Sequence, residues 1–243
     1  MSILKICHLY PDVLNLYGDR GNIICMQKRL EWRNIDVEIT ELPIGEMADF
    51  TSFDLFFIGG GQDFEQEVLT SDLFSTSKAQ NIRSAVNDGK VFLAICGGYQ
   101  MMGSYYKTWD GQQFDFINAV DMYTVGGERM IGNYIFECTP ESGGSTVVGF
   151  ENHSGKTYLG SVVSPLGRVI KGYGNNGQDG TEGCRYKNFF GTYSHGPLLP
   201  KNPEFADHIL KTALERKYGS ADLSPLDDAL ELNAHSSVIS LIS

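Results

Sequence analysis

One cysteine of the chain lies where a nucleophile is expected. Cys96 directly follows the apolar run Val91–Ile95 and precedes Gly97 and Gly98. A turn from a buried strand into a helix is sharp, so it strains the backbone of the nucleophile and requires small neighbours. The N-terminus of the following helix favours the thiolate, which is the reactive form of cysteine. The pattern predicts that Cys96 attacks a carbonyl carbon and that the Gly97 amide binds the resulting oxyanion.

The other cysteines lack this context. Free cysteine is among the most buried residue types, so we interpret the remaining four as structural. No two cysteines form a CxxC pair, and no metal site is therefore expected. The odd number of five cysteines in 243 residues indicates a reducing compartment. The four structural cysteines are Cys7, Cys25, Cys138 and Cys184.

Strand and helix signals alternate through the first half of the chain. Continuous apolar strands between helices predict an α/β fold with a parallel sheet covered on both faces. The loops after Ile58 and Ile95 leave the carboxyl ends of two such strands, where open α/β sheets bind ligands. The expected strands are 4–10, 37–42, 54–58 and 91–95, and the expected helices are 22–34, a polar stretch before Asn87, and 99–106.

The second half carries shorter strands punctuated by glycine and aromatic residues. They predict antiparallel additions to the parallel core, at 133–138, 146–151, 168–172 and 189–194. A helix is expected over 203–218, with Pro203 at its start and Gly219 just past its end. We predict one domain over residues 1–219 and a tail over 220–243 that includes a short helix at most, with the last residues loose.

Composition excludes several classes of function. A formal net charge of −11 argues against nucleic-acid binding, because phosphates would be repelled. The chain has no leader pattern at its N-terminus and no apolar run of about 20 residues to span a bilayer, so we expect a cytoplasmic protein. A phosphate-binding loop of the form GxxxxGK followed by Ser or Thr is absent, which indicates that ATP is handled elsewhere.

Two motifs carry a family resemblance. Ile95-Cys96-Gly97-Gly98-Tyr99-Gln100 resembles the nucleophile elbow of class I glutamine amidotransferases, particularly the cobyric acid synthase branch. Leu9-Tyr10-Pro11-Asp12 and Asn15-Leu16-Tyr17-Gly18-Asp19-Arg20-Gly21-Asn22 resemble the N-terminal signature of the glutaminase subunits of lipid II isoglutaminyl synthases. The resemblance covers about residues 4–197. It implies a flavodoxin-like three-layer fold, mostly parallel in its central sheet, and hydrolysis of L-glutamine.

The resemblance also implies a catalytic base. His195, in Thr192-Tyr193-Ser194-His195-Gly196-Pro197, matches the position of the family's histidine. Cys96 would attack the side-chain amide of glutamine, and His195 would hold the thiolate as an ion pair and protonate the leaving ammonia. The other histidines receive lesser roles: His153 is structural or next to the substrate, His208 is on the surface, His235 is in the tail, and His8 is buried.

Further site residues follow from the resemblance. Gly59-Gly60-Gly61-Gln62-Asp63 matches the family's oxyanion loop, which assigns the oxyanion hole to the amides of Gly60, Gly61 and Gly97. Arg129 resembles the arginine that binds the α-carboxylate of glutamine, a task that suits a guanidinium fork. Gln100, one helical turn after Cys96, is the second candidate for substrate binding.

The sequence departs from the wider class at one position. Many class I members have a glutamate two residues after the catalytic histidine, where this chain has Pro197. An imidazole gains its orientation from a third group. A backbone carbonyl, Glu204, or a carboxylate of a partner subunit could supply it. We expect the partner, so that glutaminase activity stays low until the partner docks.

The partner that the resemblance implies is a MurT-like, Mur-ligase-type synthetase that forms a heterodimer with this chain. ATP and Mg²⁺ would bind to that partner, with no cofactor in this chain. Ammonia would amidate the D-glutamate of lipid II at the inner face of the membrane, for peptidoglycan synthesis and cell shape. Two alternatives remain open: a glutaminase for another acceptor, such as a cobyrinate-type one, and a catalytically silent binding subunit.

Overall fold

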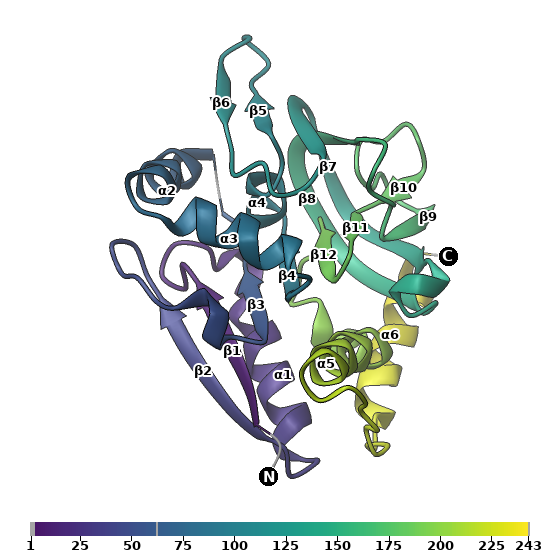
Figure 1. The fold of residues 1–243 in the computed structure, drawn as a ribbon. Coiled ribbons are helices and arrows are strands. Elements are labelled where there is room, and N and C mark those ends of the chain that lie inside the picture. Colours follow the sequence, from purple (N-terminus) through teal and green to yellow (C-terminus); the bar gives the residue numbers. More distant parts are fainter. Residues whose placement is uncertain (1–2, 62, 243) are drawn as a thin grey trace.

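Two β-sheets lie side by side in the computed structural model, which describes residues 3–61 and 63–242 (Figure 1). The first sheet has the strand order β11-β12-β4-β3-β1-β2. All neighbouring pairs are parallel except the edge pair β11–β12. Its strands are β1 (Ile3–Leu9), β2 (Asp36–Leu42), β3 (Leu55–Ile58), β4 (Val91–Ile95), β11 (Cys184–Tyr186) and β12 (Phe189–Thr192).

Helices enclose this sheet. Every residue of β3, β4 and β12 is buried, as expected of parallel strands covered on both faces. Helix α1 packs beside α5, and α2 packs beside α3. The helices of this layer are α1 (Arg20–Glu31), α2 (Asp63–Ser75), α3 (Lys78–Asn87), the short α4 (Gly97–Met101) and α5 (Pro203–Tyr218).

The second sheet is formed mainly by two long antiparallel strands, β7 (Met122–Cys138) and β8 (Thr146–Leu159). Their pairing shifts register between Gly126 and Met130, which is a bulge. The remaining strands follow the order β10-β9-β7-β5-β6. They are β5 (Tyr105–Lys107), β6 (Gln113–Asp115), β9 (Gly167–Lys171) and β10 (Thr181–Glu182), and the β5–β6 hairpin projects at the top of Figure 1.

The expected helix over 99–106 is wrong in its second half. Helix α4 ends at Met101, and the chain turns into β5, which pairs in parallel with β7. The turn brings Gly103 against β7 so closely that a Cβ atom there would lie 2.7 Å from the carbonyl oxygen of Met122. Pairing with a distant strand therefore overrides the local helical pattern. The polar stretch before Asn87 forms two helices, α2 and α3, rather than one.

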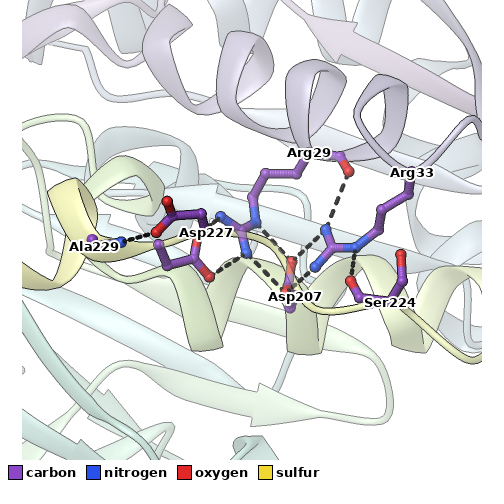
Figure 2. A network of polar contacts seen from close by, with 7 residues as sticks. Arg29, Arg33, Asp207, Ser224, Asp227 and Ala229 are labelled. Carbon is purple, nitrogen blue, oxygen red and sulfur yellow. Dashed lines mark hydrogen bonds and ion pairs between the residues drawn. The ribbon is translucent and has the colours of Figure 1, made fainter.

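The C-terminal residues form helix α6 (Ala229–Ile242), which includes positions expected to be loose. An ionic cluster fixes the segment that leads to it (Figure 2). Arg29 of α1, whose side chain is 2% exposed, donates to Asp207 of α5 at 2.7 and 2.8 Å and to Asp228 at 2.6 and 3.0 Å. Arg33 donates to Asp207 at 2.6 Å and to the carbonyl of Ser224 at 2.7 Å. In the part of the chain that the structure describes, no helix is long and apolar enough to cross a membrane.

Candidate active site

Four loops meet at the carboxyl edge of the parallel sheet, and Gly60 lies at their centre. A Cβ atom on Gly60 would lie 2.5 Å from Cε1 of His195, 3.1 Å from Oδ2 of Asp19 and 3.3 Å from Cβ of Cys96. These residues follow β3, β12, β1 and β4, which are neighbours in the sheet. The sheet order therefore brings together side chains that are far apart in the sequence.

Cys96 has the strained backbone that its context predicts. Its φ and ψ are 47° and −106°, a conformation that L-residues rarely adopt, and it immediately precedes α4. A Cβ atom on Gly98 would lie 2.6 Å from the carbonyl oxygen of Gly59, so the turn requires glycine there. The Cys96 amide donates to the carbonyl of Thr192 at 2.8 Å, which ties the nucleophile to the end of β12.

His195 is fully buried beside Cys96. Its Nδ1 lies 3.4 Å from Oδ1 of Asp19, while Nε2 makes no standard hydrogen bond to any described residue. Burial lowers the pKa of His195, but the negative charge of Cys96 and the contacts with Asp19 outweigh it and raise the pKa to about 10. The ring therefore carries a proton at neutral pH when Cys96 is a thiolate. Tyr17 packs its ring edge against the imidazole at 4.9 Å between centroids.

Asp19 is the site residue that sequence reasoning missed. Its carboxylate is fully buried, and Oδ2 accepts the Gly60 amide at 2.7 Å while Oδ1 faces His195. We expected a partner subunit to supply the third group, yet this chain supplies a carboxylate itself. Glu204, one of the other candidates, is exposed. The sequence does contain an indication of this role, because the segment Tyr17-Gly18-Asp19-Arg20 follows the first strand and contains an acidic residue.

The same segment also supports the loop that carries His195. A Cβ atom on Gly21 would lie 2.5 Å from Cγ of Pro197, so the proline packs directly on the start of α1. Asn22 accepts the amide of Leu199 at 2.8 Å through its side chain. Proline thus occupies position 197 as a packing residue, while the carboxylate comes from Asp19.

The glycines assigned to the oxyanion hole have different surroundings. The Gly60 amide donates to Asp19, so the carboxylate already occupies this donor. Gly61 lines the pocket that contains Cys96. Gly97 is the first residue of α4, and amides at that position have no acceptor within their own helix. Gly61 and Gly97 are therefore the better placed of the three. Gln62, predicted within the same loop, lies outside the described residues.

A pocket of about 310 Å³ opens at Cys96. Arg129, on the bulge of β7, lies at its wall and is exposed, and its Nε donates to the side-chain oxygen of Asn152 at 2.6 Å. Asn152 in turn donates to the hydroxyl of Tyr17. Gln100 also lines the pocket, and its amide donates to the hydroxyl of Tyr193 at 3.1 Å. The pocket thus contains both residues proposed to bind substrate.

The other histidines are held by packing. His153 lines the pocket, stacks on Tyr193 with 3.5 Å between centroids, and bonds through Nδ1 to the carbonyl of Gly155 at 2.7 Å. His208, predicted at the surface, is half-buried against the ring of Phe190, and burial lowers its pKa. His8 is buried, which lowers its pKa to about 4.

The remaining cysteines differ chemically from Cys96. Burial raises the pKa of Cys7, Cys25 and Cys138 to about 12 and that of Cys184 further still. A thiol held in its neutral form is a poor nucleophile. Of the five cysteines, Cys96 lines the pocket, together with Arg129 and Gln100.

A strained cysteine on a strand-to-helix turn, facing a buried histidine, is the arrangement that glutamine amidotransferases use. Residues 5–203 match the CobB/CobQ-like glutamine amidotransferase domain, and the chain belongs to this family. A solved glutamine amidotransferase from Thermotoga maritima shares the fold, with a TM-score of 0.57, 16% identity, and coverage of 98% of this chain and 94% of that one.

Two curated relatives are more similar in sequence. The chain is 43% identical over 236 residues to the GatD subunit of the glutamine-hydrolysing lipid II isoglutaminyl synthase of Staphylococcus aureus (strain N315), which spans 96% of this chain and 94% of the relative. It is 38% identical over 218 residues to the GatD subunit of Streptococcus pneumoniae (strain ATCC BAA-255 / R6), which spans 89% and 82% respectively.

Proposed function

We propose that this chain is the glutaminase subunit of a lipid II isoglutaminyl synthase and that Cys96, His195 and Asp19 perform the hydrolysis. The convergence of these three side chains around Gly60 carries the proposal. The similarity to two GatD subunits over most of their length supports the acceptor.

The proposed chemistry follows from the geometry. The Cys96 thiolate adds to the side-chain carbonyl carbon of glutamine, and His195 transfers its Nε2 proton to the departing nitrogen, which releases ammonia and leaves a thioester. His195 then removes a proton from water, which attacks the thioester carbon, and the proton returns to the sulfur–imidazole pair as glutamate leaves. Asp19 holds Nδ1, so that Nε2 faces the reacting atoms.

Backbone and pocket groups complete the site in this proposal. The amides of Gly61 and Gly97 stabilise the oxyanion of each tetrahedral intermediate. Arg129 binds the α-carboxylate of glutamine, and Gln100 is a buried residue of the same pocket. Arg129 reaches the pocket from the second sheet, which explains why a long strand pair accompanies the parallel core.

The partner in this proposal is a MurT-like, Mur-ligase-type synthetase that forms a heterodimer with the chain. It binds ATP and Mg²⁺, receives the ammonia and amidates the D-glutamate of lipid II at the cytoplasmic face of the membrane. The printed name of both relatives calls them subunits, which supports a separate synthetase.

The test measures glutamate release and lipid II amidation by the chain with its partner. Cys96→Ala and His195→Ala should each abolish both, whereas Cys25→Ala, on α1 and away from the pocket, should retain them. Unchanged turnover in either site variant would overturn the mechanism. Lipid II amidation is measured by mass spectrometry. Glutamate release without amidated lipid II would overturn the proposed acceptor but not the hydrolysis mechanism.

A further inference from the structure

A second buried carboxyl group lies close to the segment that carries His195. Glu182, in β10, is fully buried and does not line the cavity at Cys96. Its Oε1 accepts two hydrogen bonds, from the hydroxyl of Thr192 at 2.7 Å and from the amide of Tyr193 at 2.9 Å. Both donors belong to the segment that ends β12 and leads to His195.

Thr192 connects this carboxylate to both reacting residues. Its carbonyl accepts the Cys96 amide at 2.8 Å, and its hydroxyl oxygen accepts the Ser194 amide at 3.0 Å. The next residue, His195, pairs with Phe150 of β8 through backbone bonds of 2.9 and 3.2 Å. One side chain from the second sheet therefore helps to hold the backbone segment that bonds to the nucleophile and carries the base.

We infer that Glu182 is a positioning residue for the Cys96–His195 pair, and that it acts in its neutral form through Oε1. This inference rests on the proposed roles of Cys96 and His195. A displacement of about 1 Å at the reacting atoms can lower a rate by about 100-fold. A carboxyl group that holds Thr192 and Tyr193 by hydrogen bonds can therefore control catalysis without touching the substrate.

The surroundings of Glu182 explain why the neutral form fits. Oε2 has no standard hydrogen-bond partner among the described residues, so a negative charge on the buried carboxyl group would be only partly compensated, through Oε1. Burial, with a smaller effect from the charge of Glu151, raises the pKa of Glu182 to about 7 against the hydrogen bonds from Thr192 and Tyr193. Several acidic groups interact with Glu182, namely Glu151 of β8, Tyr134 and Cys138 of β7, Tyr99 of α4, and Tyr193.

The hydroxyl of Tyr134 also lies close to the carboxyl group of Glu182. This hydroxyl is buried without a standard hydrogen bond to described residues, and its contact with Glu182 acts against the rise in the pKa of that residue. Ionisation would place a negative charge on a carboxyl group whose Oε2 has no standard hydrogen bond and whose neighbour Glu151 disfavours that charge. We therefore expect the 192–195 segment to shift and kcat to fall as the pH rises through about 7.

The experiment compares pH profiles of glutaminase kcat for the chain with its partner. Glu182→Gln keeps the two acceptor bonds at Oε1 and replaces the acid proton by an amide donor, so it should retain kcat below pH 7 and lose the decline near pH 7. Glu182→Ala should lower kcat about 100-fold while KM for glutamine changes little. Thr192→Val should also lower kcat, and Thr192→Ser, which keeps the hydroxyl, should restore it.

Two outcomes would overturn the inference. One is a Glu182→Gln profile that keeps the wild-type decline near pH 7. The other is a wild-type kcat in both Thr192→Val and Glu182→Ala; if the alanine variant does not fold, the valine and glutamine variants decide alone. Activity in Cys96→Ala would instead refute the proposed function, so the two failures are distinguishable.

Discussion

Two buried ionic clusters of this chain are built in opposite ways. In the cluster of Figure 2, Arg29 forms paired hydrogen bonds to two aspartates, and Arg33 adds a third ion pair. At the sheet edge, Asp19 reaches His195 only at 3.4 Å, Nε2 of His195 has no standard hydrogen bond to described residues, and Cys96 is strained. A saturated cluster stabilises the fold, whereas an unsaturated one keeps a proton and an electron pair available for chemistry.

Breaking the site cluster should have the largest effect. Asp19→Asn preserves size and can still accept the Gly60 amide, but it no longer selects the tautomer of His195. We expect kcat for glutamine to fall by roughly 10³- to 10⁴-fold, with little change in the free energy of unfolding. Steady-state glutaminase assays with the partner, alongside urea unfolding, measure both. An unchanged kcat would show that the third group comes from elsewhere.

Breaking the structural cluster should do the reverse. Arg29→Met leaves Asp228 without its guanidinium partner, and we expect the free energy of unfolding to fall by about 3–5 kcal/mol. The kcat of the folded fraction should be retained. Lys28→Met on the same helix removes only the exposed pair with Glu31 and should leave stability almost unchanged. Equal losses in the two variants would contradict the comparison.

The two clusters should also respond to pH on opposite sides of neutrality. The pKa of His195 is raised from 6.5 to about 10, so its contribution to stability is complete below pH 6.5 and is lost as the pH rises through 10. The charge of Cys96 is the largest favourable cause. In Cys96→Ala this alkaline loss should therefore be smaller and occur at lower pH, as followed by thermal unfolding between pH 6.5 and 10.5.

The smallest expected effect lies on the acid side. Burial alone would raise the pKa of Asp207, but the hydrogen bonds from Arg29 and Arg33 lower it below 3.8. Its contribution is present above that value and is lost as the pH falls through the lower folded-state pKa. Asp207→Asn should unfold with a shallower dependence on pH below 4. A slope equal to that of the wild type would place the acid sensitivity in other carboxylates.

Local patterns predicted the parts of the fold that local forces decide. The strand Val91–Ile95 and the helix Pro203–Tyr218 match the sequence limits, because turn residues and the Pro and Gly signals bound them. The β5–β6 hairpin was missed, since pairing of Tyr106 with Thr124 in β7 holds it. The C-terminal helix depends in the same way on the distant Arg29.

The site divides along the same line. The turn at Cys96 is encoded within a few residues, and its backbone angles follow from that turn. The contact between Asp19 and His195 joins positions 176 residues apart and exists only because β1, β3, β4 and β12 are neighbours. Reasoning from one segment at a time could not reveal that Asp19 lies beside His195, while a carboxylate from a partner subunit stays a prediction.

Gly60 has a practical consequence. The space above its Cα is already filled by His195, Asp19 and Cys96. A single added methyl group would therefore displace these three side chains without changing their functional groups. A Gly60→Ala variant should therefore be catalytically inactive while it keeps the Cys96 thiol, the His195 imidazole and an unchanged outer surface. This variant would serve to isolate the proposed partner subunit without consuming glutamine.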